Sequence, residues 1–424
     1  GPRMPRALHT LAWLRRPYPF VERARVRYGD VFTIHIGPET FVVLAAPDDV
    51  KQVFTGDPAV FHAGEGNVIL LPFVGRRSVL LLDDAAHMTQ RRLLLPPFHG
   101  ERMRRHVGLM RDVAERAVGA WPTGVPFAVR PHMQAITLEV IMRVVFGVDE
   151  ADPALDALRE RVRRFLDVTA SPRELRKLLV LGPERAERRR VFAHAIDPVD
   201  EVIARVIADR RARGDLAERD DVLSMLLLAT HDDGSPMDDR ELRDELVTLL
   251  VAGHETTATA LSWALERLTR HPAALERLTD EVRAGEDAYV DAVIRETLRL
   301  RPVLPFVVRR LTQPQAIGGW DLPAGVNVAP SIQLVHRRAD LYPEPHAFRP
   351  ERWLGVRPGP YTFLPFGGGV RRCLGAAFAE TEMRAVLAAV VSRVRLRPSR
   401  PEFEPTARRV ITLVPARGGE VVAA

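Results

Sequence analysis

The feature that most constrains the fold is a long helical pattern from residue 238 to about residue 270. At 1.5 Å per residue, these roughly 33 residues would form a helix of ~50 Å. The middle of the run, residues 247–253, is apolar on every face. A helix that is apolar all round is typically buried, so we expect this helix to cross the interior rather than lie on the surface.

Most of the remaining sequence also predicts helices. Between about residues 101 and 300, apolar residues recur at three- and four-residue spacing with arginine and glutamate between them, a pattern typical of amphipathic helices. Another helical pattern begins at Phe378. We find no internal repeat and no linker, and therefore expect a single domain over residues 1–424.

Extended structure is predicted in three shorter places. Two β-rich runs around a turn predict a hairpin within residues 30–46. From residue 301 to 364, proline and glycine are frequent and short extended runs replace helices, and residues 410–414 are strand-like. The sequence thus predicts a mainly α protein with minor β structure (α+β).

The charge pattern argues against several function classes. The chain has 61 Lys and Arg against 55 Asp and Glu, a net charge of +6. Basic and acidic residues alternate in segments such as 184–190, which indicates a solvated helix surface and no nucleic-acid partner. No stretch approaches the ~20 apolar residues of a membrane-spanning helix. No signal segment precedes Met4, so we expect a cytoplasmic protein; the preference for arginine over lysine is typical of a bacterial, GC-rich genome.

The chain has a single cysteine, Cys373. One cysteine cannot form an internal disulfide, a Cys-x-x-Cys redox pair or a multi-cysteine zinc site. A lone cysteine is most often a small buried hydrophobe. Any functional interpretation of Cys373 must therefore come from the residues around it.

Cys373 ends a glycine-rich segment and precedes a helical pattern. Three glycines, 367–369, allow positive φ angles and close approach of the backbone to another group. A cysteine near a helix N-terminus is favoured as the thiolate. The alternative is a glycine-rich turn with an incidental cysteine. A P-loop is a poor rival because the terminal Gly-Lys-Ser/Thr is absent.

The pattern Phe-x-x-Gly-x-x-x-Cys-x-Gly resembles the haem-binding signature of the cytochrome P450 family. Its fixed positions are matched by Phe366, Gly369, Cys373 and Gly375. The resemblance implies the family's helical bundle around a buried haem b, with Cys373 as the iron ligand. It also implies that Phe366 and Gly367 approach the ligand side of the haem and that Arg371 meets a propionate.

A second motif lies inside the long helix, at Ala252-Gly253-His254-Glu255-Thr256. An acid and a β-branched alcohol are unfavourable in a buried helix, and such local violations are expected at functional sites. The motif resembles the family's oxygen-activation motif, which implies that Ala252 and Gly253 open a groove for O2. Thr256 would then hold a proton-delivering water chain, with Glu255 assisting.

Ordinary structural roles remain possible for the same residues. Thr256 could bond back to the carbonyl of Ala252, and Glu255 could pair with a nearby arginine. His254 is expected to be an outward or structural residue.

Three residues resemble the family's structural ionic network. Glu296 and Arg299 share a helix face, which by itself indicates only a surface pair. Together with Arg352, they resemble the family's Glu-x-x-Arg pair and its third member. The resemblance implies a buried network that fixes the loop carrying Cys373.

Further contacts to the haem propionates are implied by the resemblance. His87 and Arg91 lie four residues apart on one helix face and match family positions against the propionates. Arg309 is another candidate, although the adjacent Arg310 could serve instead.

The resemblance implies a monooxygenase that activates O2 and oxidises a C–H or C=C bond. No reductase domain follows Ala424, so electrons are expected from a ferredoxin and its ferredoxin reductase, and from NAD(P)H only indirectly. The substrate is expected to be a largely apolar small molecule. The expected pocket residues, apart from Ala252, are Val68, Ile69, Leu70, Phe73, Val303, Leu304, Phe306, Ile411 and Thr412. Some of them could be ordinary core.

Two other function classes share the motifs in part. A peroxygenase or a non-oxidative haem-thiolate isomerase tends to lack the acid–alcohol pair, so Glu255 and Thr256 favour monooxygenation. A haem carrier or sensor would have no use for a proton-delivery pair.

Overall fold

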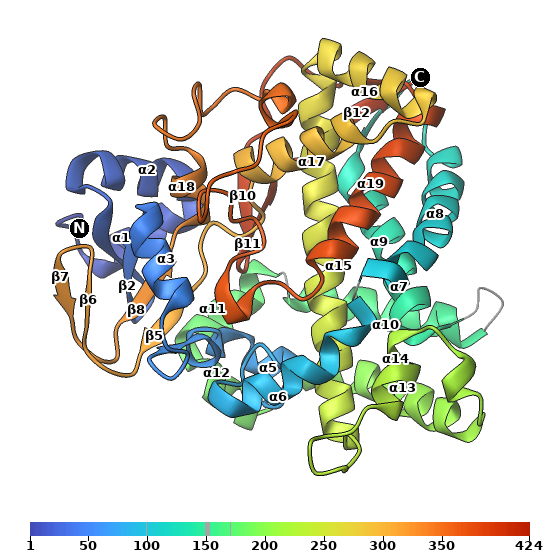
Figure 1. The fold of residues 1–424 in the computed structure, drawn as a ribbon, viewed down its shortest axis with the longest axis horizontal. Helices are drawn as coiled ribbons and strands as arrows, with labels where there is room; N and C mark the ends of the chain where they lie inside the picture. The colour runs from blue at the N-terminus through green and yellow to red at the C-terminus, as the bar shows by residue number, and fades with distance from the viewer. Residues whose placement is uncertain (99, 149–152, 170) are drawn as a thin grey trace. The chain divides into compact units, whose positions relative to one another are not determined.

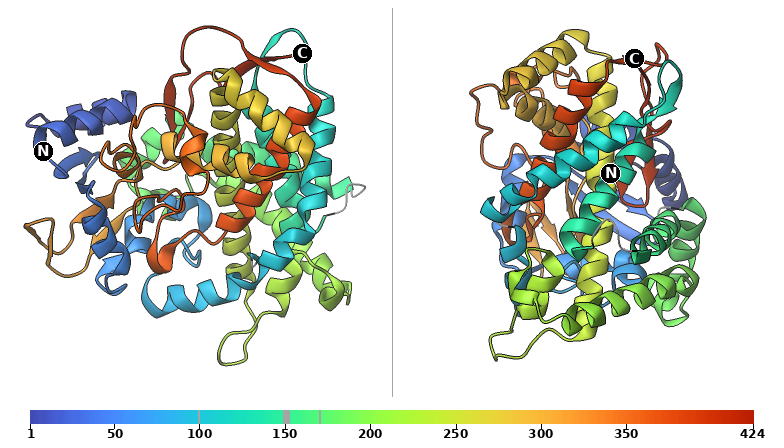
Figure 2. Two further views of the ribbon diagram at one scale, coloured as in Figure 1. Left: turned by 45° about the horizontal axis from the view of Figure 1, so that its top comes forward. Right: turned by 90° about the vertical axis from the view of Figure 1, so that its right-hand side faces the viewer.

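The computed structural model describes residues 1–98, 100–148, 153–169 and 171–424. The chain forms two compact units. Unit 1 comprises residues 1–61, 107–136 and 256–424, and unit 2 comprises residues 62–106 and 137–255. Figures 1 and 2 show the course of the chain.

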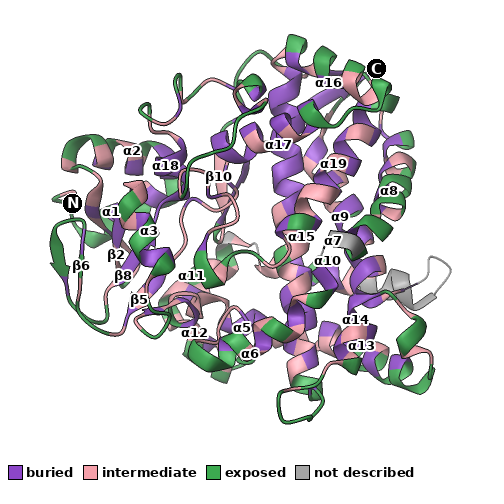
Figure 3. Cartoon of the chain, in the orientation of Figure 1, coloured by how far each residue is buried: buried purple, intermediate pink, exposed green. Residues whose placement is uncertain are grey.

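Helix α15, Asp239–Thr269, confirms the predicted long helix (Figure 1). Its first turn carries Asp239 and Glu241, whose negative charges suit the positive end of the helix dipole. Leu246, Leu250 and Leu261 are fully buried, and Figure 3 shows buried residues along most of the helix. The helix is therefore largely buried, as predicted, although Ala252 in its apolar middle is exposed.

The largest sheet has the strand order β1-β2-β8-β5-β3. It lies in unit 1, except that His62, the last residue of edge strand β3, belongs to unit 2. The bounds are β1 Val31–Ile36, β2 Glu39–Leu44, β3 Phe61–His62, β5 Arg309–Leu311 and β8 Asn327–Pro330. Strands β1 and β2 pair antiparallel, which confirms the predicted hairpin. Phe32 and Ile34 alternate into a core that includes Trp13 and Val21, so helices α1 (Arg6–Arg15) and α2 (Pro17–Tyr28) cover one face of the sheet.

The remaining helices of unit 1 pack on one another and include the predicted helix near Phe378. They are α3 Pro47–Thr55, α8 Val107–Gly119, α16 Pro272–Ala284, α17 Ala288–Leu300, α18 Ile332–His336 and α19 Ala376–Arg393. Small sheets complete the unit. Their strands are β4 Pro126–Ala128, β6 Gln315–Ile317, β7 Trp320–Leu322, β9 Leu396–Pro398, β10 Thr406–Arg409, β11 Thr412–Pro415 and β12 Glu420–Ala423.

The strand-like segment at 410–414 is only partly a strand. Val410 and Ile411 form the turn between β10 and β11, and Val410 has a φ of 51°. A two-residue hairpin turn needs positive φ angles, and the β-branched pattern of the sequence hides that requirement.

Unit 2 is helical in its described part. Its helices are α4 Ala63–Gly66, α5 Leu71–Val74, α6 Asp84–Leu94, α7 Gly100–Arg105, α10 Pro153–Thr169, α11 Pro172–Leu181, α12 Pro183–Arg188, α13 Ala193–Ala212 and α14 Val222–Leu228. Asp221 caps α14 by accepting from the Ser224 N–H at 2.9 Å, and it also pairs with buried Arg210 of α13. Helix α9, Val129–Phe146, like α15, has residues in both units.

None of the helices within the described ranges combines the length and the apolar character that crossing a bilayer requires. The structure thus agrees with the sequence that the chain is mainly α with small β-sheets.

Candidate functional site

The loop that carries Cys373 has a backbone shape that requires glycine. Gly367 and Gly369 have φ angles of +68° and +65°. A Cβ on Gly369 would lie 2.0 Å from the carbonyl oxygen of Phe54 in α3. No side chain can occupy that position without moving the backbone of α3, so α3 and this loop are held in close contact.

The cysteine lies just before a helix, as its sequence context predicted. The backbone N–H of Cys373 donates to the Phe366 carbonyl at 3.0 Å, which closes the loop. Gly375 is the N-cap of α19, so Cys373 lies two residues ahead of the cap. The Cys373 side chain is exposed. The ordinary interpretation of a lone cysteine, a buried hydrophobe, is therefore wrong here.

Arg309 lies near this loop through a shared neighbour, Phe54. The Arg309 guanidinium lies 5.8 Å from the centre of the Phe54 ring, and a Cβ on Gly368 would meet the same ring at 2.6 Å. Arg309 is 7% exposed. By contrast, Arg310 comes within 3.7 Å of the Glu39 carboxylate, so the geometry favours Arg309 as the residue next to the glycine loop.

Glu296 and Arg299 form a buried pair on α17, and neither side chain is exposed to solvent. The Arg299 Nε and Nη2 donate to the two Glu296 carboxylate oxygens at 2.8 and 2.9 Å. Three backbone carbonyls, those of His336, Pro345 and Ala347, accept the other three N–H groups of Arg299. Because all five donors of the guanidinium are satisfied, the pair is a structural element and not a surface pair.

The same carboxylate gathers the segment around Arg352. Glu296 accepts from Arg352 Nε at 3.1 Å, from Trp353 Nε1 at 2.9 Å and from the Arg349 backbone N–H at 2.8 Å. The structure therefore brings together Glu296, Arg299 and Arg352 in one hydrogen-bonded network. It adds Trp353, whose indole the sequence analysis did not assign.

His336 connects this network to the cysteine loop. Its Nε2 accepts a hydrogen bond from the Leu364 backbone N–H at 2.7 Å, and Leu364 in turn accepts from the Gly367 N–H at 3.0 Å. The His336 ring stacks on Phe363 with centroids 5.3 Å apart. Burial of the ring lowers the pKa of His336 to about 3, so it stays a neutral acceptor. The sequence does not mark His336, because a lone histidine without a partner at a defined spacing carries no signal.

The acid–alcohol motif lies on α15 as predicted. Ala252 is exposed, whereas Glu255 and Thr256 are half-buried. A Cβ on Gly253 would lie 2.7 Å from Ile141 Cδ1 of α9, so the glycine permits close helix packing. His254 is 3% exposed, and its Nδ1 lies 3.1 Å from Thr137 Oγ1. His254 is thus structural and does not point outward.

Helix α6 carries His87 and Arg91 on one face in unit 2. His87 is buried and Arg91 is half-buried. Glu245, fully buried on α15, accepts from the Val79 backbone N–H at 2.7 Å. Burial raises the pKa of Glu245 to about 8. The sequence analysis did not single out Glu245, because acidic residues are common along that part of the helix.

The predicted pocket residues of unit 2 lie around the start of α5. Val68, Ile69 and Leu70 form a half-buried 3-10 turn. Phe73 is buried, with its ring centre 4.8 Å from that of Phe192. The three residues of the turn are thus more accessible than Phe73, whose contacts are those of a core residue.

The predicted pocket residues of unit 1 divide in a similar way. The ring centres of Phe306 and Trp13 are 5.2 Å apart. Leu304 packs on the core beside the sheet, so both residues have contacts typical of core residues. The Val303 carbonyl accepts from the Leu413 N–H at 2.8 Å, which joins this segment to the β10–β11 hairpin. Ile411 is 39% exposed at the turn of that hairpin, and Thr412 is buried beside it.

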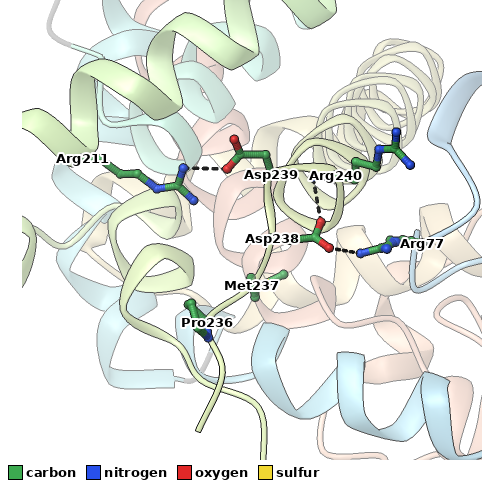
Figure 4. Close-up of a pocket in the computed structure, with 7 residues that line it drawn as sticks. All are labelled: Arg77, Arg211, Pro236, Met237, Asp238, Asp239 and Arg240. Carbon is green, nitrogen blue, oxygen red and sulfur yellow. Dashed lines mark hydrogen bonds and ion pairs between the residues drawn. The ribbon is translucent and has the colours of Figure 1, made fainter.

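A separate surface pocket of about 580 Å³ lies in unit 2 (Figure 4). Its lining includes Arg77, which pairs with Asp238, and Arg211, which pairs with Asp239 at 2.6 Å. None of the predicted site residues lines it. We therefore do not assign the candidate site to this pocket.

Known proteins match the chain along its whole length. The family model of cytochrome P450 matches residues 2–421. Cytochrome P450 135B1 of Mycobacterium tuberculosis is 45% identical over 436 residues, which cover 99% of this chain and 90% of the relative. Cytochrome P450 135A1 of the same species is 39% identical, with 99% and 94% covered.

Solved structures agree with these matches. The haem domain of cytochrome P450DA superimposes with a TM-score of 0.83 at 26% identity, covering 100% of this chain and 96% of that one. Retinoic acid-bound cyanobacterial CYP120A1 gives the same TM-score at 22% identity, with 98% and 96% covered. The cysteine loop and the buried Glu296–Arg299 pair agree with these matches. The chain belongs to the cytochrome P450 family, whose members are haem-thiolate monooxygenases.

Proposed function

We propose that Cys373 is the thiolate ligand of a haem b and that the protein oxidises a largely apolar small molecule. The observation that carries this proposal is the exposed thiol of the chain's single cysteine. Cys373 lies at the end of a loop whose shape depends on Gly369. The loop is connected to the Glu296 network through the hydrogen bond between the Leu364 N–H and His336.

The residues present suit a haem. The glycine loop and Phe366 would lie against the ligand face, followed by Gly375 at the helix cap. Four side chains would hold the propionates through charge-assisted hydrogen bonds; they are His87, Arg91, Arg309 and Arg371. Arg309 suits this role because it is buried beside the loop.

When bound, a haem with a thiolate ligand supplies reductive O2 activation, since the electron-rich sulfur favours O–O cleavage. The chain's own part is to keep Cys373 Sγ in place and to deliver protons. We assign Thr256 Oγ1 to hold ordered water and the Glu255 carboxylate to pass protons inward from solvent. Ala252, which is exposed and carries only a methyl group, would leave room for O2, and Gly253 beside it lets α15 pack closely on α9.

Replacing Thr256 tests the proton-delivery role. A Thr256→Ala variant should keep consuming NADPH but release hydrogen peroxide in place of product, because oxygen reduction would no longer be coupled to proton supply. Thr257→Ser, on the neighbouring buried position, is the matched control and should remain coupled. An unchanged product yield from Thr256→Ala would count against this assignment.

We further assign electron supply to a ferredoxin and its reductase, with NAD(P)H acting only through them. This assignment assumes that the protein is cytoplasmic. Arg372, which is exposed next to Cys373, suits an acidic ferredoxin surface. The rate of haem reduction by such a ferredoxin should fall steeply as salt increases. A rate that does not change with ionic strength would remove this partner class.

The substrate class follows from the apolar character of the residues assigned to contact it, which are Val68, Ile69 and Leu70 in unit 2 and Val303 and Ile411 in unit 1. A screen by haem spin-state shift should identify apolar ligands. Turnover of a hit under labelled O2 should place one labelled atom in the product and the other in water. Product without label would contradict monooxygenation.

A further inference from the structure

Arg408 on β10 is a half-buried cation whose guanidinium is only partly hydrogen-bonded. Its Nη1 donates to the Val410 carbonyl at 2.5 Å, and its Nε is closed off from solvent with no hydrogen-bond partner. Within the described ranges, no carboxylate forms an ion pair with it. Burial, with no charged neighbour acting on it, lowers the pKa of Arg408 to about 10. Taking a guanidinium even partly out of water costs free energy, which a carboxylate partner would offset.

The hairpin directs Arg408 toward the interior of unit 1. Arg408 pairs with Leu413 across the two strands, and directly paired residues of an antiparallel ladder project from the same face. Leu413 is fully buried. Its carbonyl accepts from Trp263 Nε1 at 3.1 Å, and its N–H donates to Val303. Arg408 therefore projects on the side of the hairpin that packs into the protein.

Arg299 and Arg210, which are almost fully buried, have partners of a kind that Arg408 lacks. Arg299 satisfies all five N–H groups, and Arg210 pairs with Asp221. Arg301 also has a shielded Nε without a partner, but its guanidinium lies 5.0 Å from the Trp263 ring centre. Arg408 thus differs from these arginines in having N–H groups that an anionic ligand could pair with.

We propose that Arg408 binds the carboxylate of an otherwise apolar acid, so that the substrate class is a long-chain monocarboxylic acid. A guanidinium offers parallel N–H groups that match a carboxylate. Val303 contacts the β10–β11 hairpin through its hydrogen bond with Leu413, and Ile411 lies in the turn of that hairpin. Their apolar side chains would contact the hydrocarbon chain of the acid. This proposal rests on the proposed function, and it goes further by assigning an anchoring group to the substrate.

The test compares acids with alcohols of equal length. Octanoic, dodecanoic and hexadecanoic acids and the matching 1-alkanols are titrated into the haem-loaded protein by calorimetry and by spin-state shift. The best acid should bind about tenfold or more tightly than its alcohol, because a hydrogen bond to a charged group contributes ~1.5–3 kcal/mol. Arg408→Leu should lose that preference and leave alcohol affinity unchanged, and Arg408→Lys should keep part of it.

Two controls make the result specific. Arg409→Leu changes the adjacent residue of β10, which lies opposite Thr412 in the strand register, whereas Arg408 lies opposite Leu413. This variant should keep the preference for acids. Haem content and the reduced-CO spectrum are measured for every variant, because a haem propionate is the other carboxylate that Arg408 could meet.

Each outcome decides the proposal. Equal affinity for acids and alcohols in the unaltered protein overturns it, and so does loss of haem from Arg408→Leu, which would assign the arginine to a propionate. If the unaltered protein fails to show thiolate-bound haem, the proposed function fails instead. Calorimetry still reports acid binding in that case, so the two failures can be told apart.

Discussion

Arg299 donates to both carboxylate oxygens of Glu296 at 2.8–2.9 Å, with neither side chain exposed to solvent. The pair lies on a single turn of α17, and the remaining hydrogen bonds of Arg299 reach two other segments of the chain, at His336 and at residues 345–347. Removing one partner of such a pair leaves a buried charge without compensation.

Arg299→Ala should destabilise the protein by about 3–5 kcal/mol, the usual cost of breaking a buried ion pair. Urea unfolding of the two proteins measures the difference. Glu344→Gln is the control, because it removes an exposed pair with Arg349 and should cost less than about 1 kcal/mol. Equal effects of the two substitutions would show that the buried network does not stabilise the fold.

His336 should act as an acceptor that positions the cysteine loop. His336→Leu removes the acceptor for the Leu364 N–H, whereas His336→Gln can retain one. We expect the reduced-CO spectrum of His336→Leu to lose part of its thiolate-type band and that of His336→Gln to recover it. Hydrogen exchange at the Leu364 amide should rise in the leucine variant alone. A leucine variant with unchanged exchange and spectrum would refute this role.

His336 also predicts a pH dependence of stability. Its pKa is lowered to about 3 in the folded protein, below the ordinary value of 6.5, so the unfolded chain binds the proton first as the pH falls. Stability should therefore decrease between about pH 6.5 and pH 3, and less steeply in His336→Gln. Unfolding free energies at several pH values in this window measure both slopes.

Glu245 should have the opposite dependence. Its pKa is raised from 4.5 to about 8 by burial, so the folded protein holds the proton that the unfolded chain releases. Stability should fall as the pH rises from about 5 to 8. Glu245→Gln keeps an acceptor for the Val79 N–H and should flatten this slope. An identical slope in the variant would mean that Glu245 does not titrate in this range.

Gly369→Ala should disturb the cysteine loop with little effect elsewhere. The new Cβ would lie 2.0 Å from the Phe54 carbonyl oxygen at a φ of +65°, so the loop must move. Gly359→Ala, where the nearest atom is an ordinary 3.5 Å away, is the matched control. We expect the thiolate-type spectrum to be lost in the first variant and kept in the second, with similar circular dichroism in both.

Much of the fold could be predicted because its strongest signals are local. The apolar middle of α15 and the two runs of the β1–β2 hairpin depend on periodicity, which the sequence shows directly. The Phe366–Gly375 pattern was likewise readable, since each of its residues is fixed by backbone shape or by chemistry within one segment.

The features that were missed depend on contacts between distant segments. His336 acts through Leu364, 28 residues away, and Glu245 through Val79, 166 residues away. No local pattern marks such partners. Phe306 shows a second limit of sequence-based prediction. An apolar residue after a motif can face a pocket or pack on the core, and only the tertiary structure shows that Phe306 contacts Trp13.

The most direct test of the account is the reduced-CO difference spectrum of the haem-reconstituted protein and of Cys373→Ser. The unaltered protein should show the red-shifted Soret band that is typical of a thiolate ligand. Cys373→Ser should lack that band while its far-ultraviolet circular dichroism remains that of a mainly helical protein. A thiolate-type band that persists in Cys373→Ser, or one that is absent from the unaltered protein, would contradict the assignment of Cys373 as the iron ligand.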